Sequence, residues 1–201
     1  METGDEYFVM SGDGPLPAAV IADDPDIASD PWYSGALIVD AISSPLVYTL
    51  VADQPGHLKP LYDDLSAPLV RQDLLDTLVA AGVDNLQTFP AEILDPGSGA
   101  RHTNYQAFNV VGVVSAVDKA RSRVRGTGLS PEAEDADTGA AEESTIVDVD
   151  FENLALDASQ ARGMLLFRLA ESVTAIVVHA SVRRRIEASG IGGIAFHGPD
   201  E

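Results

Sequence analysis

Cysteine is absent from this sequence of 201 residues. Its absence excludes disulfide bonds, thiolate nucleophiles and cysteine-ligated zinc. A chain of this length buries roughly 70% of the surface that its unfolded form exposes, so it needs neither disulfides nor a metal to hold a core. Because 45% of the residues are hydrophobic, the sequence predicts one folded domain over residues 1–201.

Basic residues are scarce, with 12 lysines and arginines against 32 aspartates and glutamates, which gives a net charge of −20 at pH 7. Such a field repels nucleic acid and anionic lipid, and it attracts basic partners. Acidity also keeps a protein soluble when no partner is involved. The charge therefore predicts no nucleic-acid partner but leaves open whether a basic partner exists.

Long apolar runs are missing as well. The strongest, Val110–Val114 and Val173–Val178, are far shorter than the ~20 residues that span a bilayer. The opening residues Met1–Met10 include acidic but no basic residues, whereas a secretory signal needs a positive start followed by an apolar stretch. We therefore expect a cytoplasmic protein with no membrane partner.

The sequence contains none of the common catalytic or metal-binding motifs. No histidine lies at helical ligand spacing from another; the four are His57, His102, His179 and His197. Gly190–Gly193 is the one glycine-rich candidate for a phosphate site, but it follows a predicted helix and is typical of a helix C-terminal turn. We predict no cofactor and no enzyme, although distant residues can assemble a site that no motif reveals.

Three acidic residues, Asp148, Asp150 and Glu152, alternate along a predicted strand, so their side chains are expected on one face. A calcium loop would need glycine at its sixth position and glutamate at its twelfth, where this sequence has Asn153 and Ser159. No metal site is predicted. The carboxylates form either a solvated strand face or a contact for a basic partner.

Strands dominate the predicted elements. Short apolar pieces bounded by turn formers predict strands at Tyr7–Met10, Ala18–Ile21, Ala36–Val39, Leu46–Val51, Asn85–Ile93, Tyr105–Val114, Thr145–Val149, Leu165–Leu169, Thr174–Val178 and Ile191–Phe196. Strands do not alternate regularly with helices, which predicts an α+β fold with a mainly antiparallel or mixed sheet and two or three helices. Residues 126–144 combine acidic residues with no basic or aromatic ones, and they predict a disordered insert.

Two helices are predicted from apolar residues at helical spacing. The first covers Pro68–Ala81 and ends before Gly82, which suits the left-handed residue beyond a helix. The second covers His179–Ser189, with His179 at the junction where capping is the usual role.

Several segments together resemble a family of bacterial immunity proteins. The segments are Leu74–Asp76, Ala81–Gln87, Phe89–Pro90, Asn104–Gly112, Val114–Asp118, Leu166–Ser172, Ile176–His179 and Val182–Arg183. Their order and spacing are similar to a former domain-of-unknown-function family that is now grouped with the immunity proteins of polymorphic toxin systems and typified by a myxobacterial member. The resemblance covers residues 65–125 and 150–196; the first third matches loosely, and the acidic insert is outside it.

The resemblance implies a protein that binds and neutralises a cognate toxin stoichiometrically, without a cofactor. It also implies a contact surface among the matched polar residues, which are Asn85, Gln87, Asn104, Arg168, Glu171 and His179. The competing interpretation is internal, because polar groups beside buried strands usually satisfy the backbone and one another. By that reasoning Arg168 and Glu171 are expected to form an internal ion pair.

Two other functions remain open from the sequence. One is an enzyme with a dispersed site in a cleft lined by Asn85, Tyr105, Arg168 and His179. The other is an acidic scaffold that binds some basic partner unrelated to toxins. The oligomeric state and the identity of the toxin are not predicted.

Overall fold

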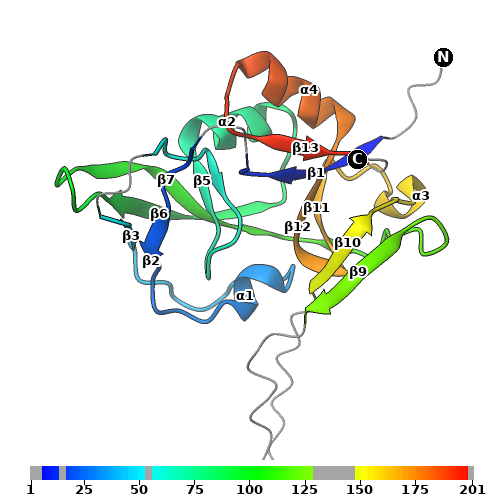
Figure 1. The fold of residues 1–201 in the computed structure, drawn as a ribbon, viewed down its shortest axis with the longest axis horizontal. Helices are drawn as coiled ribbons and strands as arrows, with labels where there is room; N and C mark the ends of the chain where they lie inside the picture. Colours follow the sequence, from blue (N-terminus) through cyan, green and yellow to red (C-terminus); the bar gives the residue numbers. More distant parts are fainter. Residues whose placement is uncertain (1–5, 14–16, 53–55, 129–147, 199–201) are drawn as a thin grey trace, which may run out of the picture.

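The computed structural model describes residues 6–13, 17–52, 56–128 and 148–198, with the backbone alone at 124–128 and 148–153. Across these residues the chain has the expected α+β fold, with two mixed sheets and four helices. Figure 1 shows the sheets side by side, with α2 (Gln72–Ala80) and α4 (Ala180–Ser189) above them and α1 (Asp30–Tyr33) below. The remaining helix, α3 (Ala158–Ala161), is a single turn.

The first sheet has six strands in the described part of the chain, ordered β2-β3-β6-β7-β5-β4. Their bounds are β2 (Ile21–Asp23), β3 (Leu46–Leu50), β4 (Leu61–Tyr62), β5 (Leu69–Arg71), β6 (Leu86–Leu94) and β7 (Arg101–Val110). Strand β3 runs parallel to β6, and the other neighbours are antiparallel. The long β6–β7 hairpin is therefore the centre of this sheet.

The second sheet has seven strands among the described residues. Its main path is β13-β1-β12-β10-β9, and β11 joins β12 to β8. Their bounds are β1 (Tyr7–Ser11), β8 (Val113–Val114), β9 (Arg123–Gly128), β10 (Asp148–Asn153), β11 (Leu166–Leu169), β12 (Ser172–His179) and β13 (Ala195–His197). The predicted strands Leu165–Leu169 and Thr174–Val178 are confirmed as β11 and β12, which pair in antiparallel fashion.

Alternating side chains divide the interior into cores on opposite faces of the central strands. In β7, Tyr105 and Ala107 belong to the core that includes Trp32 of α1, whereas Phe108 and Val110 belong to the core beneath α2 and α4. Strand β7 is therefore covered on both faces. The core beneath the two long helices draws residues from both sheets and so holds them together.

The first predicted helix begins later than the sequence indicates. Residues Leu69–Arg71 form β5 and pair with β7, with Leu69 opposite Ala107 and Arg71 opposite Tyr105. The backbone groups of these residues bond across the sheet, so α2 starts only at Gln72. Its end was predicted correctly, since Gly82 has φ +96° directly beyond the last turn.

The predicted strand Ala36–Val39 is wrong. These residues are irregular. The side chains of Gln87 and Asn109, and not a neighbouring strand, bond to the backbone of Ile38 and Ala36. In the predicted disordered insert, residues 126–128 are part of β9 and residues 129–144 lie outside the described residues.

The final helix follows the prediction closely. Val182 and Ile186 are buried, and Arg183 Nε bonds Glu187 Oε1 at 2.8 Å. Gly190 ends α4 in the left-handed region with φ +74°. Across the described ranges, no helix is long and apolar enough to cross a membrane.

Candidate functional site

Asn85 bridges the two sheets. Its Nδ2 donates to the backbone carbonyls of Val111 and Leu166, each at 2.9 Å. The backbone carbonyl of Asn85 in turn accepts the amide of Val111 at 2.9 Å. Leu166 belongs to β11, while Asn85 directly precedes β6. The side chain of Asn85 is therefore occupied by the backbone of both sheets.

Gln87 and Asn109 hold the irregular segment after α1. They lie opposite each other on β6 and β7. Gln87 Oε1 accepts the amide of Ile38 at 2.9 Å, and its Nε2 donates to the carbonyl of Ile38 at 2.8 Å. The fully buried Asn109 donates to the carbonyl of Ala36 at 2.6 Å. Two side-chain amides thus replace the strand that would otherwise satisfy this backbone.

Arg168 is fully buried, and the predicted ion pair with Glu171 is wrong. Its Nη1 donates to the carbonyl of Val173 at 2.7 Å, and its guanidinium lies over the ring of Tyr33, 4.6 Å from the ring centroid. Among the residues that the structure describes, its Nε and Nη2 have no hydrogen-bond partner. Burial lowers the pKa of Arg168 to about 10. Glu171 bonds the hydroxyl of Ser115 instead.

The remaining predicted contact residues are dispersed. His179 is the N-cap of α4, where its Nδ1 accepts the amide of Ser181 at 3.2 Å. Asn104 is exposed at a bulge, where Thr103 and Asn104 together face Glu92 of β6. The acidic residues Asp148, Asp150 and Glu152 lie on a strand, as predicted, and this strand is β10. Their carboxylates lie outside the part of the chain that the structure describes.

A cavity of about 540 Å³ lies away from these residues. It is lined by Ala19, Leu50, Gly56, His57, Leu58, Arg71, Asp95, His102 and Gly192. None of the four residues proposed for an enzyme cleft is in this lining. The polar members come from separate parts of the chain, and no sequence motif connects them.

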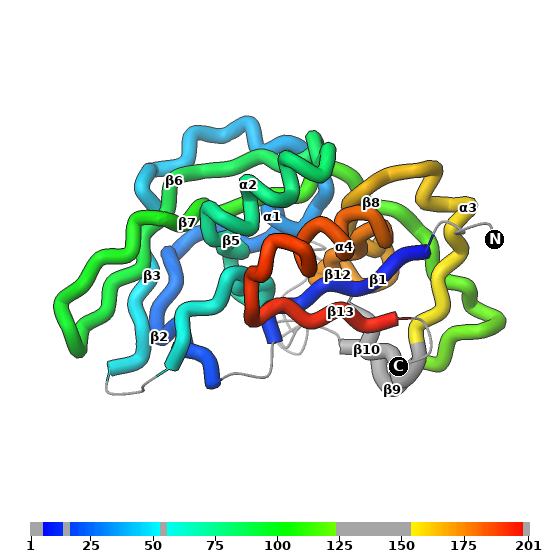
Figure 2. Tube along the Cα trace, turned by 90° about the horizontal axis from the view of Figure 1, so that it is seen from above, coloured from blue at the N-terminus to red at the C-terminus, as the bar shows by residue number. Residues whose placement is uncertain are grey.

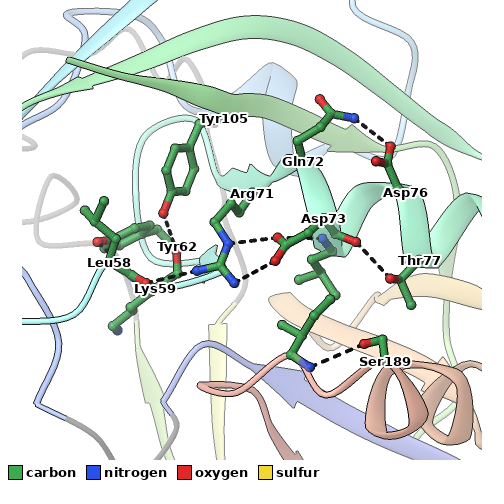
Figure 3. Close-up of polar contacts among 12 residues, drawn as sticks. Leu58, Lys59, Tyr62, Arg71, Gln72, Asp73, Asp76, Thr77, Tyr105 and Ser189 are labelled. Carbon is green, nitrogen blue, oxygen red and sulfur yellow. Dashed lines mark hydrogen bonds and ion pairs between the residues drawn. The ribbon is translucent and has the colours of Figure 1, made fainter.

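Arg71 lines this cavity, but Asp73 neutralises its charge. Arg71 Nε and Nη2 each donate to a carboxylate oxygen of Asp73 at 2.8 Å, and Figure 3 shows this fork beside Leu58. The hydrogen bond from Arg71 lowers the pKa of Asp73. Asp95 is likewise occupied, because its carboxylate accepts the amide of Gly97 within its own turn. Among the described residues no cluster of histidine and acidic side chains could hold a metal ion.

An exposed apolar segment is the clearest surface feature. We call residues 37–40 the ridge. Leu37 is 62% exposed and Val39 is 89% exposed, while Ile38 between them is buried. Asp40 follows at the surface. Figure 2 shows the segment between α1 and β3 running along the rim of the molecule beside β6. Sequence reasoning missed the ridge because three consecutive apolar residues indicated a buried strand.

Comparison with protein-family models and with curated proteins found no match to this chain. The resemblance to immunity proteins therefore stays a prediction from its motifs.

Proposed function

We propose that this chain is an immunity protein, which binds a basic toxin in the cytoplasm and neutralises it stoichiometrically. The observation that supports the proposal is the distribution of charge. Several basic side chains of the described residues are occupied internally: Arg168 is buried, and ion pairs join Lys59 to Asp13, Arg71 to Asp73, Arg101 to Glu92 and Arg183 to Glu187.

Many acidic side chains, in contrast, face solvent. Exposed examples in five different regions are Asp23, Asp26, Asp40, Asp64, Asp76 and Asp84. No lysine or arginine precedes Lys59. A surface of this kind raises the association rate with a basic protein and disfavours acidic partners.

The inhibitor would neutralise the toxin by occupying the toxin's active site. Many toxins of this kind act on nucleic acid or carry cationic sites, and carboxylates can take the place of the phosphates that such a site binds. The inhibitor then needs a rigid surface and no catalytic group, and its predicted contact residues Asn85 and Gln87 serve that rigidity through their backbone bonds. The mode of action is one toxin held by one inhibitor.

The test is protection in a host cell. The protein encoded by the gene next to the gene for this chain is expressed in a heterologous bacterium, alone and together with this chain. We expect growth arrest in the first case and growth in the second, with a one-to-one complex on size-exclusion chromatography. A neighbour that is harmless when expressed alone, or toxic in both cases, contradicts the proposal.

The scaffold alternative gives a different result in the same experiment. A scaffold forms a complex with a basic partner, but the partner expressed alone leaves growth unchanged. Growth of the cells that lack this chain therefore separates the two functions.

A further inference from the structure

We propose that the ridge, residues 37–40, is a docking surface for a basic protein whose contact patch places a large apolar side chain beside lysine or arginine. This inference rests on the proposed function, because it assigns the surface by which the inhibitor binds its partner. Its chemistry is mixed, since Leu37 and Val39 are exposed and apolar, and Asp40 beside them is acidic.

The first argument is preorganisation. Gln87 satisfies both backbone groups of Ile38, and Asn109 bonds the carbonyl of Ala36. Before the ridge, the carbonyl of Gly35 accepts the amide of Gly112 at 2.9 Å. The segment is therefore fixed before any partner arrives, so binding does not have to order it.

The second argument is that Leu37 and Val39 stay exposed to water in the unbound protein. Ile38 is buried, while its two neighbours Leu37 and Val39 stay exposed. Val39 at 89% exposure gains little from folding, whereas a partner that covers it recovers most of the free energy of burying an aliphatic side chain. Paired exposed apolar side chains on a rigid rim are typical of protein-binding sites.

The third argument is charge complementarity, which selects the occupant. Asp40 of the ridge is exposed, and the chain as a whole has a net charge of −20. A second copy of this chain would bring the same negative charge against it. A basic partner is attracted, and its lysine or arginine pairs with Asp40 while its apolar side chain covers Leu37 and Val39.

The test measures the Kd of the neighbouring toxin by isothermal titration with three proteins. They are the wild type, the double variant Leu37→Ser/Val39→Ser, and Val79→Ser as a matched control. Val79 is 59% exposed on α2, so the control removes an exposed valine from another element. We expect the double variant to bind about 30-fold more weakly. The control is expected within about twofold of the wild type.

The outcomes separate the ridge from the proposed function. If wild type and double variant bind equally, the ridge is not the docking surface, although the proposed function stands. If the wild type does not bind the toxin, the proposed function fails, and a second measurement decides the ridge.

That second measurement uses a short peptide of alternating lysine and leucine, and a counterpart with serine in place of leucine. Amide chemical shifts of residues 36–40 that move with the first peptide only, and not in the double variant, support the ridge. Shifts located elsewhere, or equal shifts with both peptides, overturn it.

Discussion

At the scale of single residues, Arg168 shows how a charged side chain can be part of a core. Its aliphatic stem and guanidinium fill space between β11 and Tyr33, although Nε and Nη2 find no hydrogen-bond partner in the described part of the chain. A buried donor without an acceptor costs about 1–3 kcal/mol. Because this cost offsets the contacts that the guanidinium makes, we expect the packing of the side chain to stabilise the fold more than its charge.

A pair of substitutions tests this balance. Arg168→Met keeps a long side chain and removes the unpartnered donors, so we expect a free energy of unfolding within about 1 kcal/mol of wild type, or above it. Arg168→Ala leaves a cavity, and we expect a loss of about 3 kcal/mol. Urea denaturation measures both. If the methionine variant loses as much as the alanine variant, the guanidinium itself stabilises the fold.

Asp63 gives a pH dependence. The residue is half-buried, and burial raises the pKa of its carboxyl to about 6. Well below pH 4 the carboxyl is protonated in both states. Between about pH 4 and pH 6 the unfolded chain ionises Asp63 while the folded protein keeps it protonated, so stability falls over this window relative to a variant without that group and levels off above pH 6.

We therefore expect Asp63→Asn to match wild type at low pH and to be more stable above pH 6, by about 2 kcal/mol after allowance for solvent screening. Urea denaturation of both proteins across this range measures the difference, and other titrating groups cancel in the comparison. A stability difference that does not change with pH is the contrary result.

For individual polar residues, the type of role could be predicted from the sequence, but the bonding partner could not. The sequence indicated that Asn85 and Gln87 could satisfy backbone groups, and the structure shows that they do. It could not indicate which backbone, because Leu166 and Ile38 are distant in the chain and are brought close only by the packed sheets. The failed pairing of Arg168 with Glu171 has the same origin, since Tyr33 is also distant in sequence.

At the scale of elements, the end of α4 offers a matched pair of glycines. Gly190 has φ +74°, whereas Gly192 is not in the left-handed region, and an added Cβ meets no atom at either position. We expect Gly190→Ala to lower the free energy of unfolding by about 1 kcal/mol, because its backbone conformation strains any side chain.

The control is Gly192→Ala, which we expect within about 0.5 kcal/mol of wild type. Thermal and urea denaturation of the two variants measure the effect. Equal losses would mean that the conformation at Gly190 is not what ends the helix.

Elements with strong local signals were predictable, and those fixed by tertiary pairing were not. The helix of residues 180–189 carries its own cap, apolar stripe and terminal glycine, so local sequence was enough. Leu69–Arg71 has apolar spacing that also fits a helix, and only its pairing with β7 decides the outcome. For the candidate site, the acidic character was predictable, but the ridge depends on Gln87 and Asn109 reaching it from another part of the chain.

At the scale of the whole molecule, the net charge of −20 makes salt the sharpest probe of the proposed binding. We expect sub-micromolar affinity for the toxin at low salt. Raising the ionic strength from about 0.05 M to about 0.5 M is expected to weaken binding by about tenfold or more. Isothermal titration at the two salt concentrations measures this.

The ridge provides a control for that experiment, since its apolar contacts are not screened by salt. The variant Asp40→Asn should show a smaller salt effect than wild type, and Leu37→Ser/Val39→Ser should keep the salt effect while losing affinity. An affinity independent of salt contradicts the electrostatic part of the proposal.

The position of β1 has a consequence for how the protein is made. Residues 7–11 pair with β12 on one side and with β13 on the other, so both neighbours are synthesised long after β1. Until then β1 has two unpaired edges, and the core beneath α2 and α4 lacks the residues that β12 and α4 contribute. Pairing over such long separations is slow, and a partly made chain is prone to aggregate. The strand of residues 7–11 is therefore secured only after β12 and β13 have been synthesised.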